Sequence, residues 1–274
     1  MTFAQHLRFF VRSFFLQTGW NYLKFQNLGL FFVMWPFLKH LYKKDTDAIP
    51  SVTERYLSSF NTQPVLAAFC FGALAREEEY IAQTKNLTEF NAEINNWLSI
   101  KRGLSITTAS IGDRLFWGSL KPLTLLLALL IWLLVGIPFF GDQTVAQQPP
   151  LWYVCWGMLA PFVAFNAIAL PVKWQGIRIS YESDGNASFG LTKFDWNRTI
   201  YYAKIIGMFF TIGMIVLGLI FYLKGLNACD LQFITRSVIV LFFVCISFIT
   251  RRLRIPNMYL YLAAVVIFNI VCYL

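Results

Sequence analysis

Long apolar runs without a charged residue constrain the fold of this chain more than any other feature of its sequence. About 20 such residues are enough to cross the hydrocarbon core of a bilayer as one helix. Four runs have roughly this length, namely Pro122–Phe140, Leu151–Pro171, Ile205–Leu223 and Asn257–Leu274. A shorter run, Ser237–Thr250, reaches spanning length only if it is extended back to residue 233. The sequence therefore predicts about five spanning helices after residue 121.

The composition also indicates a membrane protein. Hydrophobic residues make up 57% of the chain and charged residues only 14%, whereas soluble domains carry about 25% charged residues. A soluble fold with so few charges would leave large apolar areas in contact with water. We therefore exclude an ordinary cytosolic enzyme, a disordered regulator and, despite the net charge of +9, a nucleic-acid-binding protein.

The positive charges lie in the polar segments between the apolar runs and predict their orientation. Residues 172–204 contain five Lys and Arg, residues 251–256 contain three, and residues 141–150 contain none. Because cytoplasmic loops are enriched in Lys and Arg, we expect the first two segments to be cytoplasmic. Residues 141–150 and 224–232 are expected to face outward.

The first 121 residues have a different pattern, with apolar runs too short to span a bilayer alone. These runs are Leu28–Tyr42, Pro64–Ala75 and Ile106–Leu120. They are either re-entrant half-helices or amphipathic helices on the cytoplasmic surface. In a re-entrant half-helix, protein or a water-filled cavity must supply hydrogen-bond partners for the backbone N–H and C=O groups. The sequence leaves both alternatives open.

Together these patterns predict an all-α polytopic membrane protein in two parts. Residues 1–121 form the part with short, broken, re-entrant or amphipathic helices, and residues 122–274 form the transmembrane part. In the second part the cytoplasmic loop is 172–204, and the spanning helices lie at approximately 122–140, 151–171, 205–223, 233–250 and 257–274.

No group of residues in the sequence indicates catalysis or metal binding. The five cysteines lie far apart without a CxxC pair, and neither His6 nor His40 has a close ligand partner. We find no nucleophile–base arrangement and no glycine-rich phosphate loop. We therefore expect no catalytic residue, no metal and no cofactor in this chain.

A polar triplet, Asn61-Thr62-Gln63, stands directly before Pro64 and the apolar run that follows. Proline is well tolerated in the first turn of a helix, and a polar residue before it can cap the free amides. The triplet is therefore either a helix start or, because amides both donate and accept hydrogen bonds, part of a site for a hydroxyl-rich solute.

Carboxylates and an indole supply two further candidate sites. Arg76-Glu77-Glu78-Glu79 ends an apolar run, where the acids either mark a water-exposed helix end or face inward toward a partner or ligand. Gly112-Asp113 favours a turn and precedes Trp117. A carboxylate beside an indole suits a sugar, since the acid accepts from hydroxyls and the ring covers the C–H face. Such a tryptophan is equally suited to anchoring at the membrane interface.

In this order, these segments resemble the IID subunit of the mannose/fructose/sorbose class of the bacterial phosphotransferase system. Phe15–Tyr42 resembles the Q-x-x-W-N-[FY] motif and the Gly–aromatic–Pro–Leu-Tyr run that follows it. FNTQP matches a family signature, and LAREE at Leu74–Glu78 resembles L-A-x-E-E. Ile100–Pro122 aligns without a gap to G-L-x-G-P-x-A-G-x-G-D-P-x-F-W-G. The resemblance covers about residues 8–122 and continues beyond them only in hydropathy and in Phe165-Asn166.

The resemblance implies a multi-pass subunit of the bacterial inner membrane that forms a hetero-oligomer with a IIC subunit. The pair would bind and translocate a hexose, while IIA and IIB proteins deliver the phosphoryl group; IID itself is not phosphorylated. The sugar-facing residues would be Asn61, Gln63, Glu77, Glu78, Asp113 and Trp117. The residues that support them would be Gln17, Trp20 and Asn21.

The chain also departs from the family pattern. Ile106–Ser110 replaces G-P-x-A-G, Asp113-Arg114 replaces Asp-Pro, and Arg76 stands where an aliphatic residue is usual. Glycine and proline set the backbone path at a membrane break, and branched threonines do not take the same dihedrals freely. Two alternatives therefore stand beside sugar transport: a non-transporting structural or interaction subunit of the same fold, and an unrelated membrane transporter.

Overall fold

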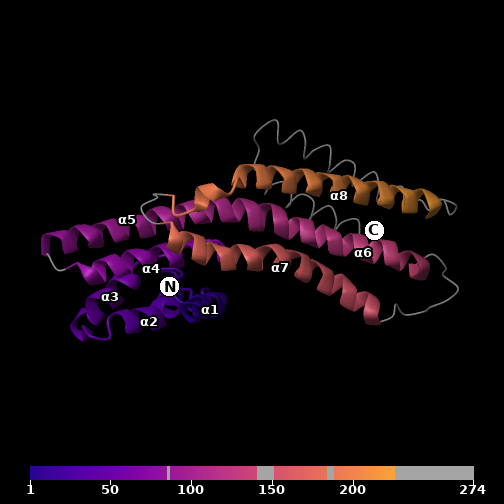
Figure 1. Cartoon of the computed structure of the whole chain (residues 1–274). Helices are drawn as coiled ribbons and strands as arrows, with labels where there is room; N and C mark the ends of the chain where they lie inside the picture. The colour runs from indigo at the N-terminus through magenta and orange to yellow at the C-terminus, as the bar shows by residue number, and fades with distance from the viewer. Residues whose placement is uncertain (85–86, 141–150, 184–187, 226–274) are drawn as a thin grey trace. The chain divides into compact units, whose positions relative to one another are not determined.

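The computed structural model describes residues 1–84, 87–140, 151–183 and 188–225, and the regular elements of these residues are all helical (Figure 1). The chain divides into two compact units, Met1–Ile212 and Gly213–Leu274. All described elements belong to the first unit except the last part of the eighth helix. The all-helical architecture predicted from the sequence is confirmed for these residues.

Within the described residues the α-helices are α1 (Phe3–Arg12), α2 (Asn27–Leu41), α3 (Ile49–Tyr56), α4 (Ala67–Gln83), α5 (Leu87–Gly112), α6 (Lys121–Phe140), α7 (Leu151–Glu182) and α8 (Trp196–Gly225). Short 3-10 turns lie at η1 (Ser13–Phe15), η2 (Thr46–Ala48) and η4 (Leu191–Lys193). The segment η3 (Asp113–Leu120) is a π-helix.

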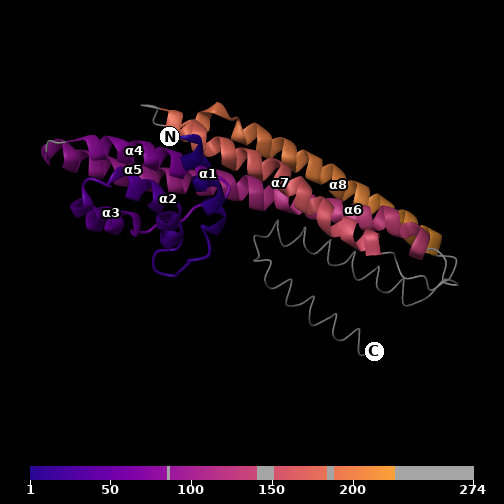
Figure 2. The same cartoon turned by 60° about the horizontal axis from the view of Figure 1, so that its bottom comes forward.

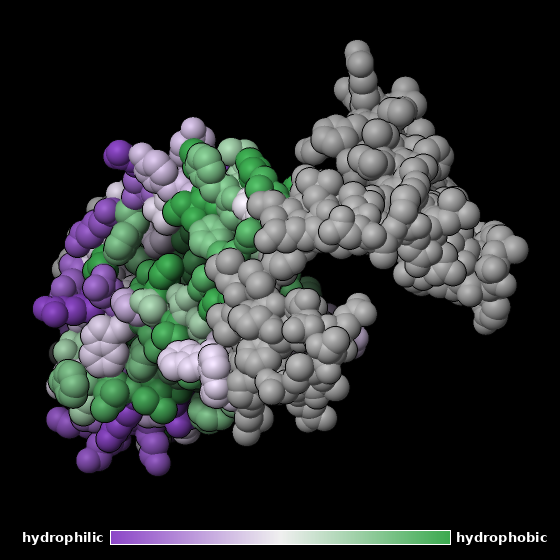
Figure 3. Space-filling view, turned by 90° about the vertical axis from the view of Figure 1, so that its right-hand side faces the viewer, coloured by the Kyte–Doolittle hydropathy of each residue, from purple (hydrophilic) through white to green (hydrophobic). Residues whose placement is uncertain are grey.

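Three stretches of the described chain are long and apolar enough to cross a membrane: Phe90–Ile131, Cys155–Glu182 and Trp196–Gly218. They include or overlap the helices predicted near 122–140, 151–171 and 205–223. In Figure 3, hydrophobic side chains cover the centre of the visible face and hydrophilic ones lie along its margin. The helices predicted at 233–250 and 257–274 lie outside the described residues.

The segments α5, η3 and α6 follow one another without a break and form one long helix (Figure 1). The predicted turn at Gly112-Asp113 is therefore wrong, and the run predicted as a short segment, Ile106–Leu120, is the middle of this helix. We attribute the π-helical segment to Pro122, because proline lacks an N–H and its ring clashes with the carbonyl four residues earlier. The wider turns of the π-helix accommodate the proline ring and the missing N–H. In these turns the Lys121 N–H donates to the Phe116 carbonyl oxygen, five residues back.

The helix α4 forms the centre of the first unit. Its first nine residues, Ala67–Ala75, are all buried, and it packs against α2, α5 and α7. A helix that is apolar on all sides belongs inside a protein or a membrane. Whether α4 enters the bilayer as a re-entrant helix stays a prediction.

The helices α4 and α7 come into close contact at two glycines, Gly72 against the α7 backbone and Gly176 against α4 side chains. A Cβ atom on Gly72 would lie 2.2 Å from the Ile177 carbonyl oxygen, and one on Gly176 would lie 2.8 Å from the Phe69 ring. Next to this contact, the Ser180 hydroxyl donates to the Phe69 carbonyl oxygen at 2.5 Å. Small residues at a helix crossing permit such close approach in membrane proteins.

The helix α1 begins with a capping box and packs against α2 and α7 (Figure 2). The Thr2 hydroxyl accepts from the Gln5 N–H at 3.3 Å, and the Gln5 side chain accepts from the Thr2 N–H at 2.8 Å. About one turn after Thr2, a ring nitrogen of His6 lies 3.0 Å from the Trp174 carbonyl oxygen. These contacts place the N-terminus against α7.

Replacing Gly72 by alanine is expected to lower the free energy of unfolding in detergent by about 1–3 kcal/mol, the usual cost of overpacking. The added Cβ would overlap the Ile177 carbonyl oxygen, so α4 and α7 must separate. Thermal unfolding followed by circular dichroism measures the change. The control is Gly207→Ala, because nothing lies within 4 Å of a Cβ there. Equal melting temperatures for the two variants would contradict the close contact.

Candidate functional site

The carboxylate of Glu78 is fully buried and already has partners within the fold. It forms an ion pair with Arg55 of α3 and accepts a hydrogen bond of 2.7 Å from the hydroxyl of Tyr42, at the end of α2. Burial raises the pKa of Tyr42, and the negative charge of Glu78 raises it further, so the phenol keeps the proton that it donates. Glu78 thus ties α2, α3 and α4 together.

The side chain of Gln63 caps the beginning of α4. Its Oε1 accepts from the N–H groups of Val65 at 2.7 Å and Leu66 at 3.0 Å, two amides that have no partner within the helix. The neighbouring Thr62 is held by Gln26, whose side-chain amide accepts from the Thr62 N–H and donates to its carbonyl. The helix start considered for this motif is present.

Asn61 is exposed and lines a pocket of about 490 Å³, called here the Asn61 pocket. Arg102, Ser105 and Ile106 of α5 line the same pocket. Lys101 also borders it, but its Nζ donates to the Ser58 hydroxyl at 2.7 Å and to carbonyl oxygens at the end of α3. Because cations are favoured at a helix C-terminus, Lys101 stabilises the end of α3. Its ammonium group is thereby occupied, whereas the exposed Asn61 side chain is open to a solute.

Asp113 and Trp117 both lie exposed on η3, four residues apart and therefore on nearly the same side of the helix. The Nζ of Lys121 lies 4.5 Å from the centre of the Trp117 ring. No ion pair joins Asp113 to Arg114 among the described residues. The carboxylate is thus open to a solute or a partner protein, whereas the indole carries the Lys121 ammonium over its ring and is exposed elsewhere.

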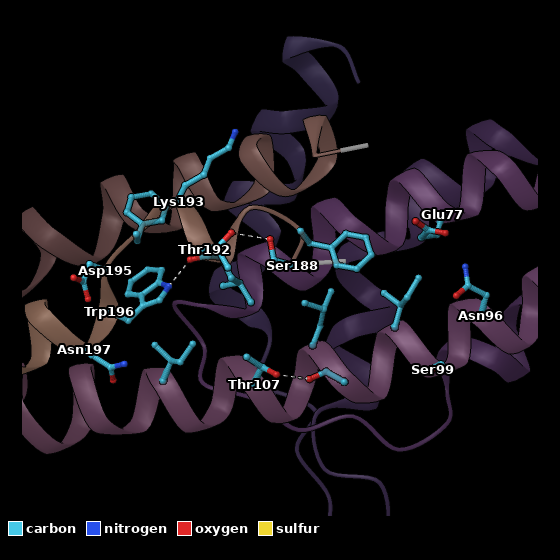
Figure 4. Close-up of a pocket in the computed structure, with 17 residues that line it drawn as sticks. Glu77, Asn96, Ser99, Thr107, Ser188, Thr192, Lys193, Asp195, Trp196 and Asn197 are labelled. Carbon is cyan, nitrogen blue, oxygen red and sulfur yellow. Dashed lines mark hydrogen bonds between the residues drawn. The ribbon is translucent and has the colours of Figure 1, made fainter. Parts of the chain in front are cut away.

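Glu77 lines the largest of these cavities, about 1060 Å³, called here the Glu77 pocket. Its walls come from α4, α5 and the segment 188–197 that leads into α8. Figure 4 shows Glu77 and Asn96 at one end of the pocket and Asp195, Trp196 and Asn197 at the other. The Trp196 indole N–H donates to the Leu191 carbonyl oxygen at 2.8 Å, which fixes the ring.

Asn96 and Asp195-Trp196-Asn197 were not among the residues predicted from the sequence. Asp195-Trp196-Asn197 lies in segment 172–204, which the sequence marked only by its positive charge. The available signal was the combination of acid, indole and amide, the same side-chain types that marked Asp113 and Trp117.

The three residues predicted to support the site lie in or near the loop before α2. Asn21 shapes this loop, because its amide donates to the Asn27 side chain at 2.9 Å and its oxygen accepts from the Lys24 N–H at 2.8 Å. Trp20 is exposed beside Tyr22. Gln17 lines a separate small pocket with residues of α7.

The structure therefore separates the six predicted sugar-facing residues. Gln63 and Glu78 hold helices in place, Glu77 faces its own pocket, and the other three lie on or beside one side of the long helix. One side of the long helix carries residues spaced three or four apart, namely 102, 106, 109, 113 and 117. The first three of these also line the Asn61 pocket. This arrangement brings Asn61 to the same side as Asp113 and Trp117. Among the described residues no three His, Cys, Asp or Glu lie close enough to hold a metal ion.

Replacing Glu78 by leucine is expected to cost about 3–5 kcal/mol of folding free energy, because Arg55 then stays buried without a counter-charge. The double variant Arg55→Met/Glu78→Leu is expected to recover most of this loss. Thermal unfolding in detergent measures both, with Glu54→Leu as the exposed control on α3. If Glu78→Leu melts at the same temperature as Glu54→Leu, Glu78 does not hold the helices together.

Comparisons with known proteins agree with the resemblance found in the sequence. Residues 1–134 match the model of the PTS system mannose/fructose/sorbose family IID component. The PTS system mannose-specific EIID component of Escherichia coli K12 is 31% identical over 172 residues, which are 63% of this chain and 53% of that protein. The fructose permease IID component of Bacillus subtilis 168 is 32% identical over 175 residues, 63% of this chain and 54% of that protein. The chain thus spans about half the length of these relatives.

Two solved structures are also similar. The cryo-EM structure of the mannose transporter ManYZ with microcin E492 (MceA) contains a chain that is 26% identical, with a TM-score of 0.52. A structure described as a membrane protein is 28% identical, with a TM-score of 0.59. Each match covers 78% of this chain and 70% of the other. Residues 1–134 and these relatives make the chain similar to the IID components of the mannose/fructose/sorbose family of the phosphotransferase system.

Proposed function

We propose that this chain is a subunit of a sugar permease in the bacterial inner membrane and works with a IIC partner. The pair binds and translocates a hexose, and IIA and IIB proteins supply the phosphoryl group for its phosphorylation. The match of residues 1–134 to the IID family model and the names of the relatives support this proposal. Five spanning helices remain part of the proposal.

The main structural support for this proposal is a polar stripe on the long helix. The helix is otherwise apolar enough to cross a membrane. The members of the stripe are exposed and lie within the candidate span Phe90–Ile131: Arg102, Ser110, Asp113, Arg114, Trp117 and Lys121. Charged side chains at membrane depth are costly and normally face protein or water. The stripe is therefore proposed to face a IIC subunit and the path of the solute rather than lipid.

Asn61, Asp113 and Trp117 are proposed to contact the hexose on this side of the helix. The Asp113 carboxylate accepts hydrogen bonds from sugar hydroxyls, and the Asn61 amide both donates and accepts. The Trp117 ring, 43% exposed, carries Lys121 over its ring, and we propose that the face opposite Lys121 meets the C–H side of a pyranose. Gln63 and Glu78 act indirectly, by holding α4 in place, and Glu77 remains a candidate in its own pocket.

The competing function is a structural or interaction subunit that does not transport sugar. It is favoured by Arg114 beside Asp113, where the family pattern has proline, because an exposed guanidinium suits a protein interface. Both functions use the same stripe. Only sugar movement distinguishes them.

Hexose uptake is expected in a strain that lacks other hexose carriers and produces this chain with its IIC, IIA and IIB partners. Asn61→Ala, Asp113→Ala and Trp117→Ala are each expected to lower the uptake rate about tenfold, the effect of losing one good polar or stacking contact. Asp47→Ala, an exposed acid of η2, is the control and is expected to keep wild-type uptake.

Two results would overturn parts of this proposal. Wild-type uptake in all three variants would remove these residues from the sugar path. Absence of uptake for every hexose tested, while the wild-type chain still co-purifies with IIC, would establish the interaction subunit instead.

A further inference from the structure

Lys173 of α7 is a buried cation to which the described residues offer no hydrogen-bond acceptor. Only 5% of its surface is exposed, and its Nζ lies 4.4 Å from the centre of the Phe14 ring. The other buried lysine of the described chain, Lys101, is different, because its Nζ donates to the hydroxyl and the carbonyl of Ser58. An ammonium group has three donors, and at Lys173 no described residue accepts from them, so they are available to a ligand.

Lys173 lines a pocket of about 200 Å³, called here the Lys173 pocket. It lies between η1, the beginning of α4 and α7. The polar residues beside Lys173 are Ser13, Gln17 and Asn166, and the apolar wall includes Phe14, Phe165 and Leu170. Drug-sized ligands occupy about 300–1,000 Å³, so this pocket accommodates one chemical group rather than a whole ligand.

The lining of the pocket offers donors and no carboxylate. The Gln17 side chain forms no hydrogen bond with the described residues, so its amide is available together with the Lys173 ammonium. The Ser13 hydroxyl and the Asn166 amide instead donate to the carbonyl oxygens of Phe10 and Phe162. A cation and a free amide donor in a small, partly apolar pocket select an anionic acceptor.

We propose that the Lys173 pocket binds the phosphate group of an anionic phospholipid. Lys173 lies in the candidate span Cys155–Glu182, in the segment whose charge pattern predicts the cytoplasmic side. Basic pockets between spanning helices on that side bind anionic lipid head groups. A free phosphate or a hexose phosphate offers the same anionic oxygens, but the apolar wall suits the glycerol and acyl parts of a lipid. This site is independent of hexose transport.

The test measures the melting temperature of the full chain in neutral detergent as phosphatidylglycerol is added. The wild-type melting temperature is expected to rise to a plateau, because a ligand of the folded state stabilises it. The variant Lys173→Met keeps the apolar stem but loses the charge. The lipid concentration that gives half of the maximum rise is expected to be at least about tenfold higher for this variant, because one charge-assisted contact is lost. Without lipid, Lys173→Met is expected to melt no lower than wild type.

The matched control is Lys204→Met, which removes an exposed lysine of α8 and is expected to respond to phosphatidylglycerol like wild type. An equal response of Lys173→Met and wild type would overturn the proposal. Equal stabilisation by zwitterionic phosphatidylcholine would do the same. A rise produced by inorganic phosphate or hexose phosphate without lipid would assign the pocket to a soluble anion instead.

Discussion

The burial of α4 against α7 is the constraint on which the rest of the first unit depends. Two glycines allow the backbones to meet, and the uncharged first half of α4 fills the space between its neighbours. Each end of α4 is then secured by a polar group, the Gln63 cap at the beginning and the Glu78 ion pair toward the end. These two motif residues therefore hold the fold together, and the same fold positions Asn61 beside α5.

A second constraint is the continuity of the long helix formed by α5, η3 and α6. Ile106–Ser110 contains no glycine or proline, so nothing in this stretch interrupts the helix, and the strain from Pro122 is absorbed in η3. Because the helix continues, exposed polar residues separated by up to 19 positions, from Arg102 to Lys121, lie along its surface in one stripe. An interrupted helix would have scattered them.

Much of this architecture follows from local sequence. Apolar length identified the helices near 122–140, 151–171 and 205–223, and Pro64 marked the turn that leads into α4. The role of each acid in Glu77-Glu78-Glu79 did not follow, because neighbours on a helix point about 100° apart. One faces a pocket, one pairs with Arg55 and one accepts from Tyr181. Which acid turns inward depends on how α3 and α7 pack, and this depends on tertiary contacts.

The central claim is that the stripe on α5 and η3 borders a water-accessible sugar path shared with a IIC subunit. Single cysteines at Arg102, Ser110 and Arg114, in a chain whose own cysteines are replaced, test it in intact cells that produce the IIC partner. The claim predicts that a water-soluble maleimide labels these positions and that a transported hexose slows the labelling. Labelling only by lipid-soluble reagents, at a rate that no hexose changes, would contradict it.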